Sequence, residues 1–468
     1  MIARELGRVY IRIVKSFSFN KQNSEPWVIW GAASLFALFI YFIQPAISIM
    51  IEPIKQTFHT NDIGIGFLSS SFFYTYALMQ IPIGVLIDKI GVRRVLAISI
   101  VGTFFSCIFF AYSGTYSMAL ISRIAMGFFS AAAFPCAFCL AAEWFPSKLF
   151  PTVVGFTEML GLLGGACAAT ILSSTVVMYG WRNTSLLTAC FAATVGFIAI
   201  YCVKDSIGNK ITNFDAGGSR SLDNDIVFSD DDYSGVINDN KELKSTQQET
   251  ESLSEVKQET EEVAKKIGNK LLFVISHIQI WYLSLYSGML FVVIGAFFSL
   301  WGIPFIMEKY SVSIESAANS MVLAFLGAAI GTPLMAWYGH KSHKKKLLMF
   351  IGSVVTLLLL LLLFYLPISK LFSYLLLFLI GLSCTVYIIP FSIVKTIFPK
   401  EVCGTAMSFT NAICVSIGTL LLQPIIGWIL HEKSGGKIPS LDDYFTALVL
   451  IPICIMLSLI FLWKIRTE

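Results

Sequence analysis

The stretch GVLIDKIGVRRVL at residues 84–96 places a glycine and an aspartate ahead of two arginines, directly after a long apolar run. A similar stretch, AWYGHKSHKKKLL, follows another long apolar run at residues 336–348, an offset of 252 residues. At an offset of 253 residues, the Phe-Pro pair at 145–146 coincides with the Phe-Pro pair at 398–399. Agreement at two separate places indicates that the chain contains two similar halves.

The composition is typical of a membrane protein. Hydrophobic residues make up 56% of the 468 residues, charged residues only 13%, and the mean hydropathy is +0.75, whereas a soluble domain carries about 25% charged residues. The ten cysteines lie mostly inside apolar runs, where a thiol acts as a small apolar side chain. The basic residues are scattered, which argues against a nucleic-acid partner. Because we find no Ser/His/Asp set, metal-ligand cluster or P-loop GxxxxGK[ST] element, we expect no enzyme, no cofactor and no bound metal.

Twelve apolar runs are long enough to cross a hydrocarbon core about 30 Å thick. They cover residues 27–51, 64–87, 94–113, 116–141, 150–176, 183–203, 277–305, 317–338, 346–366, 371–397, 404–430 and 442–464. With the repeat, these runs predict an all-α polytopic membrane protein, in which twelve transmembrane helices form two pseudo-symmetric six-helix bundles around a cavity near the midplane.

The charged residues divide the chain further. The predicted parts are an N-terminal tail (1–26), a first bundle (27–203), an acidic linker (204–270), a second bundle (271–464) and a C-terminal tail (465–468). The linker is too polar to bury a core, so we expect it to be largely disordered. Lys and Arg are concentrated on the side that holds both termini, and cytoplasmic loops carry the excess of these residues. We therefore expect both termini to lie in the cytoplasm. We also expect the protein to be a monomer in the lipid bilayer of a bacterial plasma membrane.

Three motifs resemble elements of one known family. Residues 84–94 resemble the signature loop of the major facilitator superfamily, between its second and third spans. The stretch RIAMG at 123–127 resembles the RxxxG element of its fourth span, and Gly-Trp-Arg at 180–182 is similar to the start of its sixth span. The resemblance is to the twelve-span type, with no subfamily identified. It implies secondary transport by rocker-switch alternating access, in which the two halves tilt about a shared site.

The same resemblance implies a conformational latch on the cytoplasmic side. It places the start of span eleven, near Gly404, opposite Gly84, where the absence of a side chain allows a close approach. The aspartate of the loop would then lie at the positive N-terminal end of that helix. The latch residues are Gly84, Asp88, Gly91, Arg93 and Arg94, and together they would favour the outward-open state. In the alternative interpretation, the basic residues only anchor the topology.

Two charged residues lie well inside predicted spans, where a charge is a functional candidate by default. Arg123 in span four lies about 10 Å below the outer surface, and Glu158 in span five about 12 Å from the cytoplasmic side, at about 1.5 Å per residue. Their depths differ by roughly 8 Å in a core about 30 Å thick, so a pair, direct or bridged by substrate, is feasible. In one interpretation the two residues form a static buried pair. In the other, Arg123 binds a substrate carboxylate or phosphate, and Glu158 exchanges a proton as the site fills.

Polar residues near the middle of other spans are further candidates for the substrate cavity, because a ring with a polar tip suits an amphipathic ligand. They are Tyr41 and Gln44 in span one, Tyr74, Tyr76 and Gln80 in span two, Tyr286 in span seven, Tyr387 in span ten, and Asn411, the repeat equivalent of Glu158, in span eleven. For each of them, helix packing or an interfacial belt is the alternative.

The predicted function is proton-coupled symport of a small organic anion or zwitterion, such as a carboxylate, an amino acid, a peptide or a carboxylate siderophore. Protons and this small molecule are the predicted partners. Span five contains the glycine-rich stretch GLLGG at 161–165 but lacks the proline of the family's antiporter element, which favours symport. Two alternatives stay open: a multidrug or metabolite exporter acting as a proton antiporter, and a transporter-like receptor that signals through the acidic linker.

Overall fold

The computed structural model describes residues 25–146, 149–203, 271–341 and 344–466. Ten helical stretches in these residues are long and apolar enough to span a membrane. One of them, Thr152–Cys202, contains two helices, because its backbone is not helical at Gly180. Helix α5 (Asp62–Ile90) adds a further helix of 29 residues, about 43 Å long at 1.5 Å per residue. The described residues thus accommodate the twelve crossing helices that the sequence predicts.

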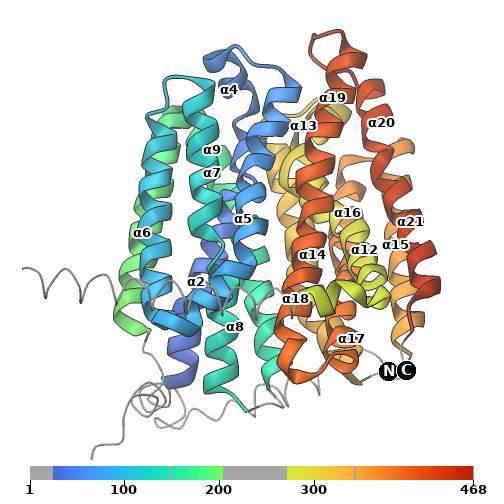
Figure 1. Cartoon of the computed structure of the whole chain (residues 1–468). Coiled ribbons are helices and arrows are strands. Elements are labelled where there is room, and N and C mark those ends of the chain that lie inside the picture. Colours follow the sequence, from blue (N-terminus) through green and yellow to red (C-terminus); the bar gives the residue numbers. More distant parts are fainter. Residues whose placement is uncertain (1–24, 147–148, 204–270, 342–343, 467–468) are drawn as a thin grey trace, which may run out of the picture. The chain divides into compact units, whose positions relative to one another are not determined.

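The helices form two bundles, one from each half of the sequence. The first half (residues 25–203) contains α2 (Glu25–Ile43), α3 (Ala46–Ile49), α4 (Ile51–Phe58), α5, α6 (Val92–Ala111), α7 (Tyr116–Ser130), α8 (Ala133–Trp144) and α9 (Phe150–Cys202). The second half (residues 278–466) contains α12 (Ile278–Val292), η2 (Val293–Trp301), α13 (Gly302–Tyr310), α14 (Ile314–Lys341), α15 (Lys345–Tyr365), α16 (Lys370–Cys384), η3 (Thr385–Ile388), α17 (Ile389–Ile397), α18 (Lys400–Val415), η4 (Ser416–Leu421), α19 (Leu422–Ser434), α20 (Leu441–Leu448) and α21 (Leu450–Lys464). In Figure 1 the blue-to-green helices form the first bundle and the yellow-to-red helices the second.

The bundles have two ends. The α4 face is the end that carries α4 and the loop between α19 and α20, and the α8 face is the opposite end, where α8 and α17 end (Figure 1). Residues 271–276, which precede α12, are helical. The predicted linker (204–270) and most of the predicted N-terminal tail lie outside the described residues, so these domain boundaries stay predictions.

Glycines make the sharp turns between helices. Gly91, in the signature loop, separates α5 from α6 with φ 87° and ψ 155°, a conformation that side chains with a Cβ rarely adopt. Gly180 interrupts α9 with φ 75° and ψ 164°. Shortly after this break, Arg182 donates to the carbonyls of Ala111 and Ser113, over 2.9 and 2.7 Å, and so caps the end of α6. The Gly-Trp-Arg motif is therefore a helix break followed by a helix cap.

A basic residue from each copy of the signature loop binds the last helix of its own half. Arg93 Nη2 donates to the carbonyl of Ile200 near the end of α9, over 3.1 Å. Lys346 Nζ donates to the carbonyls of Trp463 and Ile465 at the end of α21, over 2.9 and 3.0 Å. A cation at a helix C-terminus is favourable because the carbonyls there carry partial negative charge. The two copies of the loop therefore make similar contacts, through positions that differ by one residue at the offset of 252.

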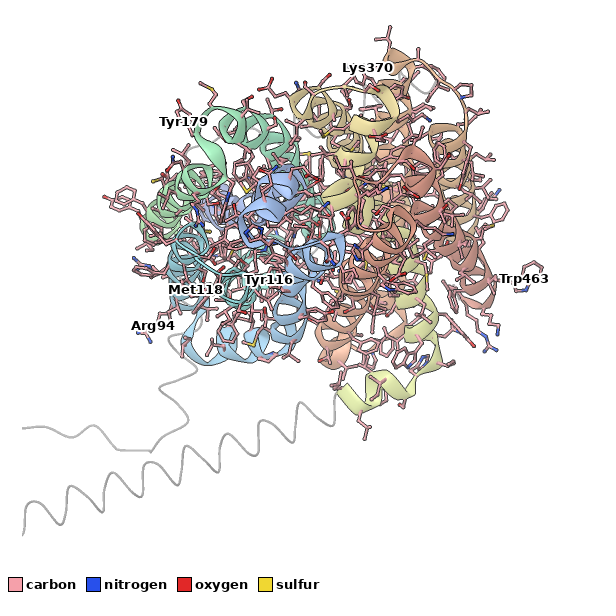
Figure 2. The ribbon with its side chains drawn as sticks, turned by 90° about the horizontal axis from the view of Figure 1, so that it is seen from above. Arg94, Tyr116, Met118, Tyr179, Lys370 and Trp463 are labelled. Carbon is pink, nitrogen blue, oxygen red and sulfur yellow. The ribbon has the colours of Figure 1, made fainter. Side chains whose placement is uncertain are left out.

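We expect Lys346→Met to lower the free energy of unfolding by about 1 kcal/mol, because two carbonyls of α21 lose a charged donor. The apparent melting temperature of the purified protein should fall by about 2 °C, whereas Lys346→Arg should leave it nearly unchanged. Arg94→Met is the control, since Arg94 is exposed and lies at the periphery of the bundle (Figure 2). An equal loss of stability in Lys346→Met and Arg94→Met would contradict the cap.

Candidate functional site

Glu158 lies among hydroxyl groups of the first half. It is on α9, and the hydroxyl of Tyr41 on α2 donates to Glu158 Oε2 over 3.3 Å. Tyr76 on α5 lies close enough to the Glu158 carboxyl group for the two to interact electrostatically. Tyr41 and Tyr76 are only 7% and 4% exposed. The carboxyl group is therefore held in a largely buried, polar environment.

The second half contributes to the same place. Tyr387 in η3 and Cys414 on α18 both lie close enough to the Glu158 carboxyl group to interact with it electrostatically. Both side chains are buried. Asn411 precedes Cys414 by three residues and is partly exposed, and residues three apart lie on one face of a helix. The Glu158 cluster, defined as Tyr41, Tyr76, Glu158, Tyr387 and Cys414, therefore draws on both halves of the chain.

Glycines on α9 bring Tyr41 to Glu158. A Cβ at Gly161 would lie 2.9 Å from the Tyr41 ring, and a Cβ at Gly164 would lie 2.0 Å from the carbonyl oxygen of Leu38 on α2. Helices α2 and α9 are therefore in backbone contact, as small residues allow in membrane bundles. The ring of Tyr41 occupies the space beside Gly161, about one turn from Glu158.

Arg123 on α7 has different surroundings. It is 2% exposed, and its guanidinium carbon lies 5.0 Å from the centroid of the Phe72 ring. Arg123 Nη1 donates to Met126 Sδ over 3.8 Å, but Nε and Nη2 are buried and have no hydrogen-bond partner in the described structure. A buried cation without a partner is costly. The two unpartnered N–H groups therefore mark Arg123 as a candidate ligand-binding residue.

The RxxxG element has a structural explanation. A Cβ at Gly127 would lie 1.8 Å from the carbonyl oxygen of Phe72, and Thr75 Oγ1 donates to the carbonyl of Ile124 over 2.7 Å. The backbones of α5 and α7 are therefore in contact at the glycine. This contact holds the ring of Phe72 against the guanidinium of Arg123, one turn away on α7.

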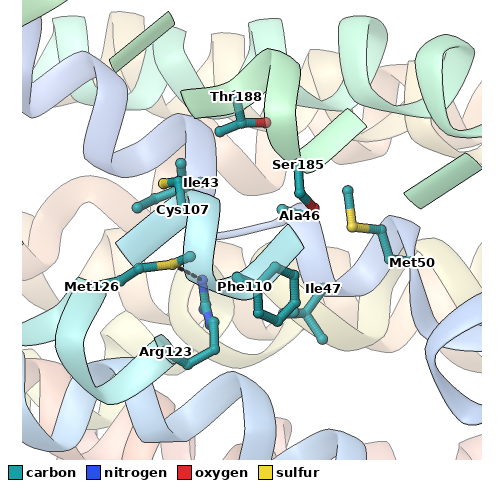
Figure 3. A pocket seen from close by; sticks show the side chains of 10 residues that line it. All are labelled: Ile43, Ala46, Ile47, Met50, Cys107, Phe110, Arg123, Met126, Ser185 and Thr188. Atoms are coloured by element: carbon teal, nitrogen blue, oxygen red, sulfur yellow. Dashed lines mark hydrogen bonds between the residues drawn. The ribbon is translucent and has the colours of Figure 1, made fainter. Parts of the chain in front are cut away.

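A cavity of ≈ 20 Å³ lies beside Arg123, inside the first half (Figure 3). A cavity of this size holds on the order of one water molecule, so an organic substrate does not fit there in this conformation. Its other lining residues are Ile43, Ala46, Ile47, Met50, Cys107, Phe110, Met126, Ser185 and Thr188. The hydroxyl groups of Ser185 and Thr188 donate to carbonyls of their own helix, so toward the cavity they offer acceptors.

The described structure does not join Arg123 and Glu158 in an ion pair, whereas Lys55 pairs with Glu52 and Asp62. Phe72, against Arg123, stacks on Tyr76 with ring centroids 5.8 Å apart and an interplanar angle of 18°. Tyr76 belongs to the Glu158 cluster. Two stacked rings therefore connect the surroundings of the cation with those of the carboxyl group.

Gln80 and Gln44, predicted to line the cavity, lie near these groups. Gln80 follows Tyr76 by one turn of α5, is buried, and interacts through its side chain with the Tyr76 hydroxyl group. Gln44 is partly exposed at the break between α2 and α3, next to Ile43 in the cavity wall. Gln80 thus adds a buried amide group on the helix face that also carries Tyr76.

Tyr286 and Tyr74 instead connect neighbouring helices. The Tyr286 hydroxyl, fully buried, donates to the carbonyl of Met349 over 3.1 Å and is 2.9 Å from Ser353 Oγ, so it joins α12 to α15. Tyr74 is 44% exposed, and its hydroxyl donates to the carbonyl of Leu420 over 3.4 Å. These contacts support the helix-packing interpretation for both residues.

The described residues do not test the predicted latch around Gly84. Apart from the neighbouring backbone of α5 itself, no atom of the described structure lies within 4 Å of the position that a Cβ of Gly84 would take. Arg93 binds a carbonyl of its own half, Arg94 is exposed, and the side chain of Asp88 lies outside the described part. The latch stays a prediction for a conformation in which this end of α5 contacts the second half.

Phe72 and Cys414 were missed from the sequence, because single apolar side chains inside a span carry no distinguishing signal. For Phe72, the one usable signal was its position one turn before Tyr76 on the same helix face. Within the described ranges, no group of three or more His, Cys, Asp or Glu side chains is arranged to hold a metal ion.

Comparisons with known proteins agree on one family. A family model described as Major Facilitator Superfamily matches residues 29–423 and 283–468. The chain is 28% identical over 168 residues to the "Probable L-galactonate transporter" of Escherichia coli (strain K12), a match covering 35% of each protein. It is 22% identical over 313 residues to the "Membrane sensor protein UhpC" of the same organism, covering 67% of this chain and 63% of that protein. Both matches span less than two thirds of the relative.

A solved structure shares the fold. A bacterial homolog of the human lysosomal transporter Spinster, in an inward-facing and unoccupied conformation, superposes with a TM-score of 0.67 at 16% sequence identity. The match covers 94% of this chain and 97% of that one.

We expect Gly164→Ala and Gly31→Ala to change stability in opposite directions. A Cβ at Gly164 collides with the backbone of α2, whereas a Cβ at Gly31 has no neighbour within 4 Å. Overpacking costs about 1–3 kcal/mol, while alanine is favoured over glycine in a helix by about 1 kcal/mol. Thermal unfolding of the purified variants checks this prediction, and equal shifts in both would contradict the backbone contact between α2 and α9.

Proposed function

This chain belongs to the major facilitator superfamily, and we propose that it is a secondary transporter that carries a small organic anion together with protons. The resemblance seen in the sequence is confirmed at the level of the family, and with it the all-α fold of a multi-pass membrane protein. The family consists of membrane transporters rather than enzymes, as expected from the sequence. Substrate class, coupling ion and site residues belong to the proposal.

Arg123 carries the argument for an anion. Its guanidinium is 2% exposed and keeps two N–H donors without a partner in the described structure. A carboxylate or phosphate accepts two hydrogen bonds from a guanidinium in one plane, so such a group would satisfy both donors and the charge together. The name of the L-galactonate transporter, which contains a sugar-acid anion, supports the same class of substrate.

Glu158 supports the coupling to protons. It is the carboxyl group of a cluster that draws on both halves, and its described hydrogen-bond partner is a hydroxyl group, that of Tyr41. An ionised carboxylate is costly to bury without a cation, and more so when an anionic substrate is bound nearby. A proton on Glu158 would remove this cost while the loaded site is closed, and its release on one side would complete the cycle.

The substrate must displace side chains to reach Arg123. The cavity beside Arg123 has the size of about one water molecule, and the ring of Phe72, stacked on Tyr76, lies against the guanidinium. We assign the anionic group of the substrate to Arg123. The hydroxyl groups of the substrate would form hydrogen bonds with Gln80, with Asn411 and with the tyrosines of the Glu158 cluster. Tyr76 would turn aside as the substrate enters.

The orientation in the membrane follows from the basic residues. Arg93 and Arg94 start α6 and residues 344–346 start α15, both at the α8 face. Since cytoplasmic loops carry the excess of Lys and Arg, we assign the α8 face to the cytoplasm of a bacterial cell and the α4 face to the outside. Both termini would then be cytoplasmic.

A receptor is the second candidate function. The match to the membrane sensor protein UhpC extends over 67% of this chain, more than the match to the L-galactonate transporter. In this candidate the same anion site would bind without transport, and the acidic stretch 204–270 would contact a cytoplasmic partner.

We expect proteoliposomes containing the protein to accumulate L-galactonate when the outside is more acidic, and not to accumulate galactitol, which lacks the carboxylate. Arg123→Ala should reduce uptake by more than tenfold, because a charged hydrogen-bond partner is lost, and Arg123→Lys should retain part of it. Glu158→Gln should still exchange labelled for unlabelled L-galactonate but lose accumulation driven by the pH gradient.

Four outcomes would contradict a part of this proposal or favour the receptor. Uptake that ignores the pH gradient would contradict proton coupling, and uptake that survives Arg123→Ala would contradict the assigned anion site. Thermal stabilisation by L-galactonate without uptake would favour the receptor. Failure of L-galactonate and of a panel of mono- and dicarboxylates to stabilise the protein would contradict an organic-anion substrate.

A further inference from the structure

We propose that two hydroxyl groups of the first half lock the α4 face, by donating to carbonyls of the second half that a proline leaves without their usual helical donor. Ser48 Oγ on α3 donates to the carbonyl of Leu300 over 2.5 Å, and the Tyr74 hydroxyl on α5 donates to the carbonyl of Leu420 over 3.4 Å. Both hydrogen bonds cross between the halves. We call these four residues the hydroxyl lock; it does not depend on which substrate is carried.

The two acceptor carbonyls lack a donor for the same reason. Pro304 stands four residues after Leu300, and Pro424 stands four residues after Leu420. In an α-helix the N–H of residue i+4 donates to the carbonyl of residue i, and proline has no N–H. Inside a membrane every backbone polar group needs a partner. A hydroxyl from the opposite half therefore satisfies each carbonyl when the α4 face is closed.

Both carbonyls lie at the ends of π-helical turns, beyond the i+5 hydrogen bonds that close them, which run from Gly302 N–H to the carbonyl of Phe297 and from Leu422 N–H to the carbonyl of Ile417. The two turns are braced against each other. Leu300 lies in η2 and Leu420 in η4, and π-turns within helices are frequent at functional sites. Gln423 Nε2, just after η4, donates to the carbonyl of Gly295 over 2.7 Å and to Ser299 Oγ over 3.1 Å, both in η2. The second half thus presents both acceptors from one connected unit.

Two glycines bring the halves into backbone contact beside the lock. A Cβ at Gly66 on α5 would lie 2.9 Å from both the carbonyl oxygen of Gln423 and the Cα of Pro424. A Cβ at Gly427 on α19 would lie 2.5 Å from the carbonyl oxygen of Asp62. The contact is reciprocal, because each glycine faces the backbone of the other helix. Any larger residue at either position would push α5 and α19 apart.

The opposite end of α5 lacks such a contact at Gly84, where a Cβ would meet no atom of another described helix within 4 Å. Among the described residues, the backbone contact of α5 with the second half therefore lies near Gly66. When the halves tilt to open the α4 face, both hydrogen bonds of the lock must break and water must reach the two carbonyls. The lock therefore stabilises the conformation with a closed α4 face.

Hydrogen–deuterium exchange of the full-length protein in lipid nanodiscs tests the lock. Ser48→Ala and Tyr74→Phe should each raise exchange at residues 62–70 about fivefold, the factor for loss of one neutral hydrogen bond, and lower exchange at residues 84–90. Gly66→Ala should act in the same direction.

Matched controls should leave exchange at both ends unchanged. In Ser174→Ala the lost hydroxyl donates only within α9, to the carbonyl of Thr170. In Tyr112→Phe the ring is 70% exposed. A rise at both ends of α5, or no change in either Ser48→Ala or Tyr74→Phe, would overturn the proposal.

A double-mutant cycle tests the role of the proline. Pro304→Ala gives residue 304 an N–H that can donate to Leu300, so Ser48→Ala in this background should change exchange by less than twofold. Additive effects of Ser48→Ala and Pro304→Ala would show that the carbonyl of Leu300 has another hydrogen-bond donor, and would overturn the proposal. If Pro304→Ala does not fold, the same cycle with Tyr74→Phe and Pro424→Ala decides.

Discussion

The requirement that every backbone polar group in a membrane interior have a partner determines much of this structure. Where a helix ends or is interrupted, the carbonyls released there are bonded by a residue from elsewhere. Arg182 caps α6, and Lys346 caps α21. The same requirement explains a contact next to Pro304 in the second half. Because Pro304 has no N–H, the carbonyl of Leu300 lacks its helical donor, and it accepts from Ser48 instead. Helix breaks are thus places where one part of the chain holds another.

Backbone proximity is the second principle, because lipid provides no hydrophobic force to press helices together. Glycine allows contacts that any other residue would prevent. Gly127 lets α7 touch the carbonyl of Phe72, Gly164 lets α9 touch α2, and Gly66 lets α5 touch α19. The two residues of the RxxxG motif therefore have different roles. Gly127 sets the distance between α5 and α7, and the guanidinium of Arg123 packs against the Phe72 ring that this distance brings close.

The sequence predicts the fold well because span length and apolar composition are nearly sufficient for membrane helices. The turn at Gly91 was equally readable, since a positive φ needs glycine. The site was predicted less completely. Polar residues in mid-span face either a cavity or a neighbouring helix, and helices that are apolar all round give no periodicity to separate the two cases. Thus the hydroxyl of Tyr41 bonds to Glu158, whereas that of Tyr286 bonds to α15 and that of Tyr74 to η4.

The depth of a residue in the membrane also does not determine which side of its helix the side chain faces. Arg123 and Glu158 have depths that permit a pair, yet Arg123 faces the interior of the first half and Glu158 faces a cluster shared by both halves. A static pair would have neutralised both charges once and for all. Because the structure does not pair the two, the guanidinium is available to an anion and the carboxyl group to a proton under the function proposed above. Two separate groups would then give two binding events that can be linked, and linked binding is what coupled transport requires.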